Sequence, residues 1–194
     1  MDANLSQLVA ALTNLDLAVR SQAAEQLSRL GPDAQPAAVA LVQACNDDAE
    51  EVREWAVAAL EELGSPLVTD AETLAGLLTA DNADVGYWAA TLLGRLGPDA
   101  APVVPSLAAA VAESRHESVR QRAAWALGKI GPSAKAAVGA LKKASASPSV
   151  GRCPIKGFVY PLVGDRLEAS VYPDRDVFKL LRATFSDRCI HEHE

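Results

Sequence analysis

The sequence of 194 residues predicts an all-α solenoid, because one helical skeleton occurs four times along the chain. The skeleton ends in a glycine each time, and these glycines lie 33, 33 and 34 residues apart. A period between about 20 and 50 residues indicates stacked supersecondary units. Ala and Leu dominate while aromatic residues make up 5%, a composition that suits closely packed helices and argues against an all-β core. The four copies are residues 19–31, 52–64, 85–97 and 119–131.

Each unit predicts two helices, which we call A and B. In the B helix, counting from its first Val as position 0, apolar or small residues recur at positions 0, 4, 8 and 11, the spacing of one buried helical face. Gly then ends the helix, and Pro follows directly at three of the four junctions. At the other junction, Thr69 and Glu72 have the spacing of a capping box. The predicted B helices cover residues 19–30, 52–63, 85–96 and 119–130.

The A helices share a leucine ten residues after each closing glycine, which fixes the register of the repeats: Leu41, Leu74, Leu107 and Leu141. Residues 1–144 are therefore predicted to hold four complete helix pairs and a fifth A helix without its B partner. The predicted A helices lie around residues 4–14, 34–46, 70–80, 100–113 and 133–144.

The repeat unit resembles the HEAT-repeat family, in particular the short bacterial HEAT-like repeats also found in phycobilisome lyases. The resemblance lies in the Val-Arg start of the B helix, its stripe of Ala and Leu, and its closing Leu-Gly. The resemblance implies a right-handed α-solenoid of HEAT-like helical hairpins, with B helices lining its concave surface. It also implies an alternative function, a phycobilin-lyase-like chromophore-handling protein or an enzyme accessory subunit. Deoxyhypusine hydroxylase is a HEAT-like enzyme with His-Glu iron ligands inside its helices. Here His116-Glu117 precedes the helix, so that motif does not carry over.

After residue 144 the repeat pattern stops. Residues 145–151 have the composition of a linker, and residues 152–194 contain all three Phe and two of the three Cys. Two strands followed by a helix would make a small ββα cap on the last repeat, since terminal repeats need capping. The alternative is a poorly structured tail or a non-native end. The sequence leaves these alternatives open.

Charge and composition narrow the classes of function. The net charge is −7, but residues 1–84 carry fifteen acids against three bases, whereas residues 85–144 carry three acids against eight bases. An acidic first half argues against a nucleic-acid groove through all repeats. The polarity either serves only solubility or allows head-to-tail association. No apolar run reaches the ~18 residues of a membrane span, and the first residues lack a secretory signal. With three scattered cysteines, these features predict a cytoplasmic protein.

The B-helix residues that point away from the core are the candidate binding residues. Positions 3, 6 and 10 lie off the buried stripe, and position 6 is expected to be the most exposed. Aromatic and cationic residues gather at these positions and beside them, the composition of a binding hot spot. The alternative is that tryptophans at position 3, and less so Trp125 at position 6, fill crevices between repeats. The predicted partner-binding residues are Trp55, Tyr87, Trp88, Arg95, Arg122, Trp125 and Lys129.

Position 1 holds Arg20, Arg53 and Arg120, which are expected to pair with acids or carbonyls of the neighbouring turn. The third repeat has Gly86 there. This departure predicts either a weaker joint or room beside Tyr87 for a ligand.

Few sequence features indicate a catalytic or metal-binding site. The alternating ligand-type residues of the last six positions, 189–194, lack an ordered frame, and the chain has no phosphate loop or nucleophile elbow. We therefore expect no metal, no cofactor and no catalytic residue. The predicted function is a non-enzymatic protein–protein interaction scaffold that binds a partner along the concave B-helix face. Arg122 and Lys129 would favour an acidic stretch of that partner, and the acidic first half a basic one.

Overall fold

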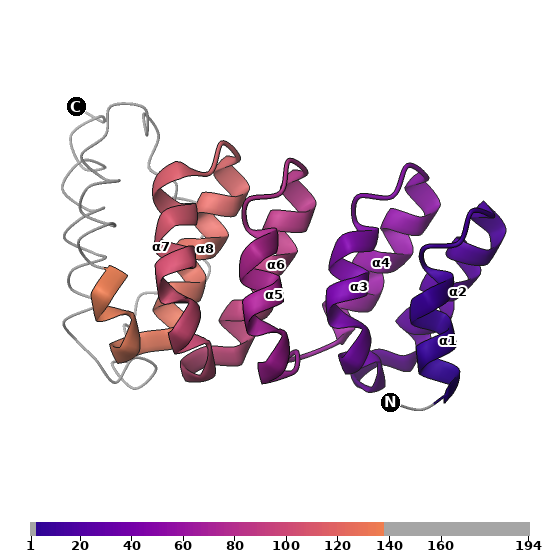
Figure 1. Ribbon diagram of the computed structural model, residues 1–194, viewed down its shortest axis with the longest axis horizontal. Coiled ribbons are helices and arrows are strands. Elements are labelled where there is room, and N and C mark those ends of the chain that lie inside the picture. The colour runs from indigo at the N-terminus through magenta and orange to yellow at the C-terminus, as the bar shows by residue number, and fades with distance from the viewer. Residues whose placement is uncertain (1–2, 138–194) are drawn as a thin grey trace, which may run out of the picture.

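A computed structural model describes residues 3–137, which contain four helix pairs. Figure 1 shows that the pairs stand side by side in a row. The predicted all-α solenoid is confirmed, and this part of the chain contains no strand. The first residues of the fifth A helix predicted at 133–144 belong instead to a 3-10 segment, Gly131–Ala137. The rest of that predicted helix, the predicted linker at 145–151 and the C-terminal segment at 152–194 lie outside the described residues. The pairs are α1 (Ala3–Ala11) with α2 (Leu17–Leu30), α3 (Ala38–Ala44) with α4 (Glu50–Glu62), α5 (Ala71–Leu77) with α6 (Ala83–Leu96), and α7 (Val104–Glu113) with α8 (Glu117–Ile130).

Each A helix after the first is preceded by a 3-10 segment, so the predicted starts at residues 34, 70 and 100 are corrected. Pro36 and Pro102 lie inside two of these segments, where proline disfavours the α conformation of the residue before it. The predicted capping box is also wrong, because Thr69 lies in a 3-10 turn and α5 begins at Ala71 without a side-chain cap. The segments are η1 (Gly31–Ala37), η2 (Val68–Asp70), η3 (Gly97–Val103) and η4 (Gly131–Ala137).

The four closing glycines have positive φ angles of 54°, 77°, 61° and 71°, which L side chains rarely adopt. No atom crowds the space where a side chain would stand at Gly31, Gly64 or Gly131. The backbone conformation that ends each B helix, rather than close packing, therefore requires glycine at these junctions.

The core consists of the predicted stripe together with the A-helix leucines. At position 8 of the B helices, Leu27, Leu60 and Leu93 are 0% exposed and Leu127 is 1% exposed. Burying one such side chain contributes about 1.5–3 kcal/mol of transfer free energy. All four leucines belong to one hydrophobic core cluster that extends through the repeats. On the A helices Leu41, Leu74 and Leu107 are fully buried.

The arginines at position 1 have the predicted structural role. The Nε of Arg20 lies 2.7 Å from a carboxylate oxygen of Asp47, which belongs to the next pair, and Arg53 donates to the carbonyl of Asp47 at 2.7 Å. Burial raises the pKa of Asp47, but the hydrogen bonds from Arg20 and from the backbone of Ala49, together with the charges of Arg20 and Arg53, outweigh burial and hold that pKa below its ordinary value. Arg120 likewise donates to the carbonyl of Ser114 at 2.8 Å.

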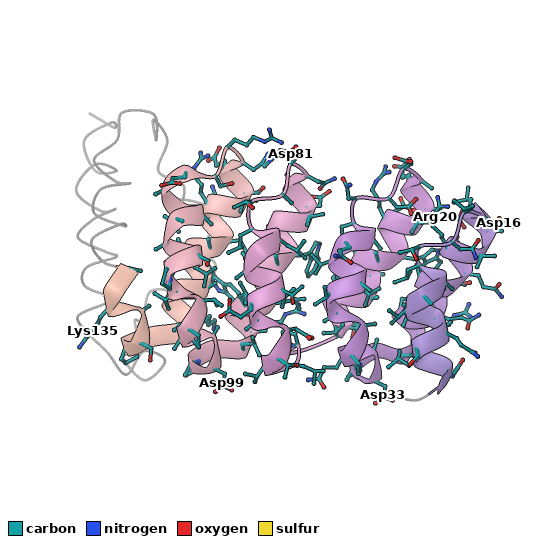
Figure 2. The ribbon with its side chains drawn as sticks, viewed as in Figure 1. Asp16, Arg20, Asp33, Asp81, Asp99 and Lys135 are labelled. Carbon is teal, nitrogen blue, oxygen red and sulfur yellow. The ribbon has the colours of Figure 1, made fainter. Side chains whose placement is uncertain are left out.

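Side chains in the loops link neighbouring pairs along both edges of the row. Figure 2 shows Arg20 and Asp81 at the edge where the A-to-B loops lie, with Asp33 and Asp99 along the opposite edge. At the first edge Arg115 forms an ion pair with Asp81 at 2.6 Å. At the opposite edge the side-chain amide of Gln35 donates to the carbonyl of Ser65 at 2.9 Å.

The B helices are not evenly packed along the row. α2 packs along α4, and α6 packs along α8, whereas α4 and α6 lack this close side-by-side contact and α6 instead reaches α3. The wider interval between the second and third pairs is visible in Figure 1. The side chains between α4 and α6 therefore decide how the two halves of the row are joined.

In residues 3–137, no helix combines the length and the apolar character needed to cross a bilayer.

Candidate binding site on the B helices

Six of the seven predicted binding residues form one connected set on α6 and α8. The guanidinium of Arg122 lies between two rings, 4.4 Å from the ring centre of Tyr87 and 4.9 Å from that of Trp125. It also donates a hydrogen bond to the hydroxyl of Tyr87. The Nζ of Lys129 lies 5.7 Å from the ring centre of Trp125. Cations stacked on aromatic faces in this way are held by the ring quadrupole, at about 0.5–2 kcal/mol each.

The set continues on the other side of α6. The rings of Tyr87 and Trp88 meet edge to face with their centres 5.6 Å apart, and the guanidinium carbon of Arg95 lies 5.8 Å from the Trp88 ring centre. Trp55 is not in this set. It is half-buried on α4, where it packs against the core.

Glycines on α6 create the space into which α8 packs. A Cβ atom at Gly94 would overlap the six-membered ring of Trp125, so the ring rests directly on the backbone of α6. A Cβ at Gly86 would lie 2.8 Å from Cγ2 of Val119. The expectation that Gly86 leaves room for a ligand is therefore wrong, because the side chain of Val119 fills that space. The expectation of a weaker joint stays a prediction.

Burial corrects the predicted order of exposure. Thr91 at position 6 is only 4% exposed and Trp88 at position 3 is 8% exposed, so the crevice-filling alternative holds for Trp88. An interior B helix is covered by neighbouring repeats on both sides as well as by the core. The angle of a residue from the core stripe does not predict the burial that these neighbours cause. Position 10 is exposed on three of the four B helices, at Arg29, Glu62 and Lys129, and position 3 is exposed on α2, at Gln22.

Arg95, at position 10 of α6, bridges the interval between the two halves. Its guanidinium donates to the carbonyl of Leu60 at 2.7 Å and to that of Gly64 at 3.2 Å, both at the C-terminal end of α4. Burial lowers the pKa of Arg95, and the nearby charge of Arg122 lowers it further. α4 has no basic residue in its own last turn, so Arg95 supplies the cation that a helix C-terminus favours.

The accessible part of the set consists of Tyr87, Arg122, Trp125 and Lys129, which we call the cationic aromatic patch. The first three are half-buried and Lys129 is exposed. Apart from the two cations of the patch, the described residues from 85 to 137 are nearly balanced in charge, with four Lys and Arg against three Asp and Glu. The neighbouring α4 is opposite in sign and exposes Glu54, Glu61 and Glu62.

Sequence reasoning missed the part played by Gly94. Gly94 lies in the interior of a helix, where glycine lowers stability by about 1 kcal/mol relative to alanine. A glycine kept at such a position indicates that another group packs closely against the helix backbone there. The same signal at Gly128, the equivalent position of α8, has no such partner, since nothing lies within 4 Å of its Cβ direction.

Other reactive groups in the described part of the chain do not assemble into a site. Residues 3–137 contain no group of three His, Cys, Asp or Glu side chains placed to hold a metal ion. Cys45 is buried, and burial raises the pKa of its thiol to about 12. A thiol with that pKa is almost entirely protonated at neutral pH and therefore unreactive. The cysteine and histidines of residues 189–194 lie outside the described residues.

Comparison with known proteins supports the repeat type. Residues 71–153 match the family model for HEAT repeats. Two engineered proteins of known crystal structure align with TM-scores of 0.51 and 0.50, at 21% and 22% identity, each over 96% of this chain and over 96% and 98% of their own length. A designed armadillo repeat protein aligns with a TM-score of 0.50 at 17% identity, over 95% of this chain and 89% of its own. No curated protein sequence matches the chain.

These likenesses show the fold, an armadillo- or HEAT-like helical repeat solenoid, and they do not extend to function. The resemblance to repeats of the phycobilisome-lyase type stays a prediction.

Proposed function

We propose that the protein is a non-enzymatic binding scaffold whose protein partner lies along the B-helix face, anchored at the cationic aromatic patch. The observation that carries the proposal is the fixed geometry of Arg122 between the rings of Tyr87 and Trp125. Trp, Tyr and Arg are the residues that most often carry binding energy at protein interfaces. Because their positions are set before binding, little side-chain entropy is lost when a partner docks.

The helical repeat architecture supports the same reading. A solenoid contributes extended surface rather than a deep pocket, and its stacked repeats place equivalent helix positions in a row. The patch occupies two successive B helices, so one extended partner segment crossing α6 and α8 reaches all four of its residues.

The proposal is tested by affinity capture from native cell lysate. The variant is Trp125→Ala, and Trp55→Ala is the matched control, because Trp55 is also half-buried but lies outside the patch. We expect the wild type and Trp55→Ala to capture the same protein and Trp125→Ala to lose it, with all three chains equally helical by circular dichroism. Undiminished capture by Trp125→Ala would show that Trp125 is only a packing residue and would refute the proposal.

A further inference from the structure

We propose that the joint between the second and third helix pairs is the hinge of the solenoid, about which its two halves rotate. This motion lies within the chain, so it goes beyond the proposed function and does not depend on it. The joint differs from the joints on either side of it in its connecting segment, its helix packing and its polar contacts. We call the edge of the row with the A-to-B loops the loop edge, and the edge with the closing glycines the glycine edge.

The connecting segment is more exposed at this joint. The first and third closing glycines open the same sequence, Gly-Pro-Asp-Ala, and each begins a seven-residue 3-10 segment. The second opens Gly-Ser-Pro-Leu, residues 64–67, and leads to a 3-10 segment of three residues, η2. Leu67 is 37% exposed, whereas its equivalents Ala34 and Ala100 are 0% exposed. The chain therefore crosses the second joint as an exposed, irregular segment.

The helices on the two sides of this joint share less packing than helices at the neighbouring joints. η1 packs against α4 and η3 against α8, whereas η2 packs against α5 and lacks a comparable contact with α6. α6 also lacks the side-by-side contact with α4 that joins the other neighbouring B helices, and it touches α3 to a smaller extent instead. Rotation at this joint therefore disrupts less buried contact than rotation at its neighbours.

A neutral hydrogen bond takes the place of an ion pair at the loop edge. The side-chain amide of Asn82 donates to the side-chain oxygen of Asn46 at 2.9 Å, and this bond is exposed. Ion pairs cross the other two joints at this edge, Arg20 with Asp47 at 2.7 Å and Arg115 with Asp81 at 2.6 Å. Hydrogen bonds between neutral groups are about half as strong as charge-assisted ones, so this edge is held less firmly at the second joint.

The sequence explains this difference. Arg53 has the same helix position as Arg20, and each donates from its Nη1 to two carbonyls of its own A-to-B loop. Arg20 also reaches Asp47, five residues before the first Val of the next B helix, but the equivalent residue of the third pair is Ala80. Arg53 therefore lacks the acid across the joint that Arg20 has.

The glycine edge is held more firmly and forms the pivot. There Arg95 of α6 donates to the carbonyl of Leu60 at 2.7 Å and to that of Gly64 at 3.2 Å. The hydroxyl of Ser65 in turn donates to the carbonyl of Arg95 at 2.8 Å, and Figure 1 shows that the chain itself crosses the joint at this edge. Hinges use a few residues at the ends of elements, and their motions take microseconds to milliseconds. We therefore expect α4 and α6 to move apart at the loop edge and stay together at the glycine edge, which changes the curvature of the B-helix face.

The test is dipolar electron paramagnetic resonance of the full chain carrying pairs of nitroxide labels, with the native cysteines replaced by alanine. Each label replaces the exposed residue directly before the first Val of a B helix, at the loop edge. The pair across the second joint is Glu51→Cys with Asp84→Cys. The matched pairs across the first and third joints are Ala18→Cys with Glu51→Cys, and Asp84→Cys with Ser118→Cys. We expect the distance distribution across the second joint to be broader than both others by about twofold or more.

A pair at the glycine edge of the same joint, Glu62→Cys with Asp99→Cys, locates the pivot. Its distribution should be narrow and should broaden on Arg95→Ala, while the pair across the first joint stays unchanged. All labelled chains must be as helical as the unlabelled chain by circular dichroism. Equal widths for the three loop-edge pairs would overturn the hinge. An equally broad distribution at the glycine edge, or no response there to Arg95→Ala, would overturn the pivot.

Discussion

Arg95 is predicted to be the main polar link between the two halves of the solenoid, so its removal should cost more stability than removal of Arg29, the arginine at the same position of α2. The guanidinium donates to the carbonyls of Leu60 at 2.7 Å and Gly64 at 3.2 Å. Hydrogen bonds to a charged group contribute about 1.5–3 kcal/mol each when buried. Since Arg95 is half-exposed, we expect Arg95→Ala to lower the free energy of unfolding by about 2 kcal/mol.

The matched control is Arg29→Ala. Arg29 occupies the same position of α2, but its side chain is 71% exposed and its partner Glu25 is on the same helix. Loss of such a pair should cost about 0.3–0.5 kcal/mol. Urea unfolding followed by circular dichroism measures both variants. Equal losses for Arg95→Ala and Arg29→Ala would refute the idea that Arg95 replaces the missing contact between α4 and α6.

Three further perturbations test the packing and the buried charges. Gly94→Ala should push the Trp125 ring off α6, cost about 1–3 kcal/mol and shift Trp fluorescence, whereas Gly128→Ala, with open space around it, should stabilise by about 0.5–1 kcal/mol in thermal unfolding. Cys45, with its pKa raised to about 12, should resist iodoacetamide in the native protein at neutral pH and react in urea, as read by peptide mass spectrometry. The lowered pKa of Asp47 means that its stabilisation is present above the ordinary aspartate pKa of about 3.9 and lost as pH falls through the lower folded value. Unfolding of Asp47→Asn should therefore depend less on pH in that acidic range than unfolding of the wild type.

The helices and the core could be predicted because the sequence patterns that indicate them lie within single helices. A stripe at positions 0, 4, 8 and 11 is a property of one helix, and it placed Leu27 and Leu93 in the core correctly. The pairing of Arg20 with a neighbouring turn was predictable because the repeat brings equivalent residues to equivalent places.

The sequence left open whether Trp88 is buried, because its burial depends on the distance between α4 and α6. Helical periodicity gives the direction of a side chain relative to the core, but it does not give the spacing of the next repeat. The same holds for Trp125, whose position depends on Gly94 of another helix. The stacking of Arg122 between two rings follows from these interhelical distances and could be expected only as a gathering of aromatic and cationic residues.

Hydroxyl-radical footprinting of the complex with the captured partner tests most directly whether the partner lies on the B-helix face. The partner should protect the side chains of Tyr87 and Trp125 from oxidation. It should leave Leu67 unchanged, because this residue is exposed in the segment between α4 and α5, outside the patch. Unaltered oxidation of Trp125 in the complex, or protection confined to Leu67, would contradict binding at the cationic aromatic patch.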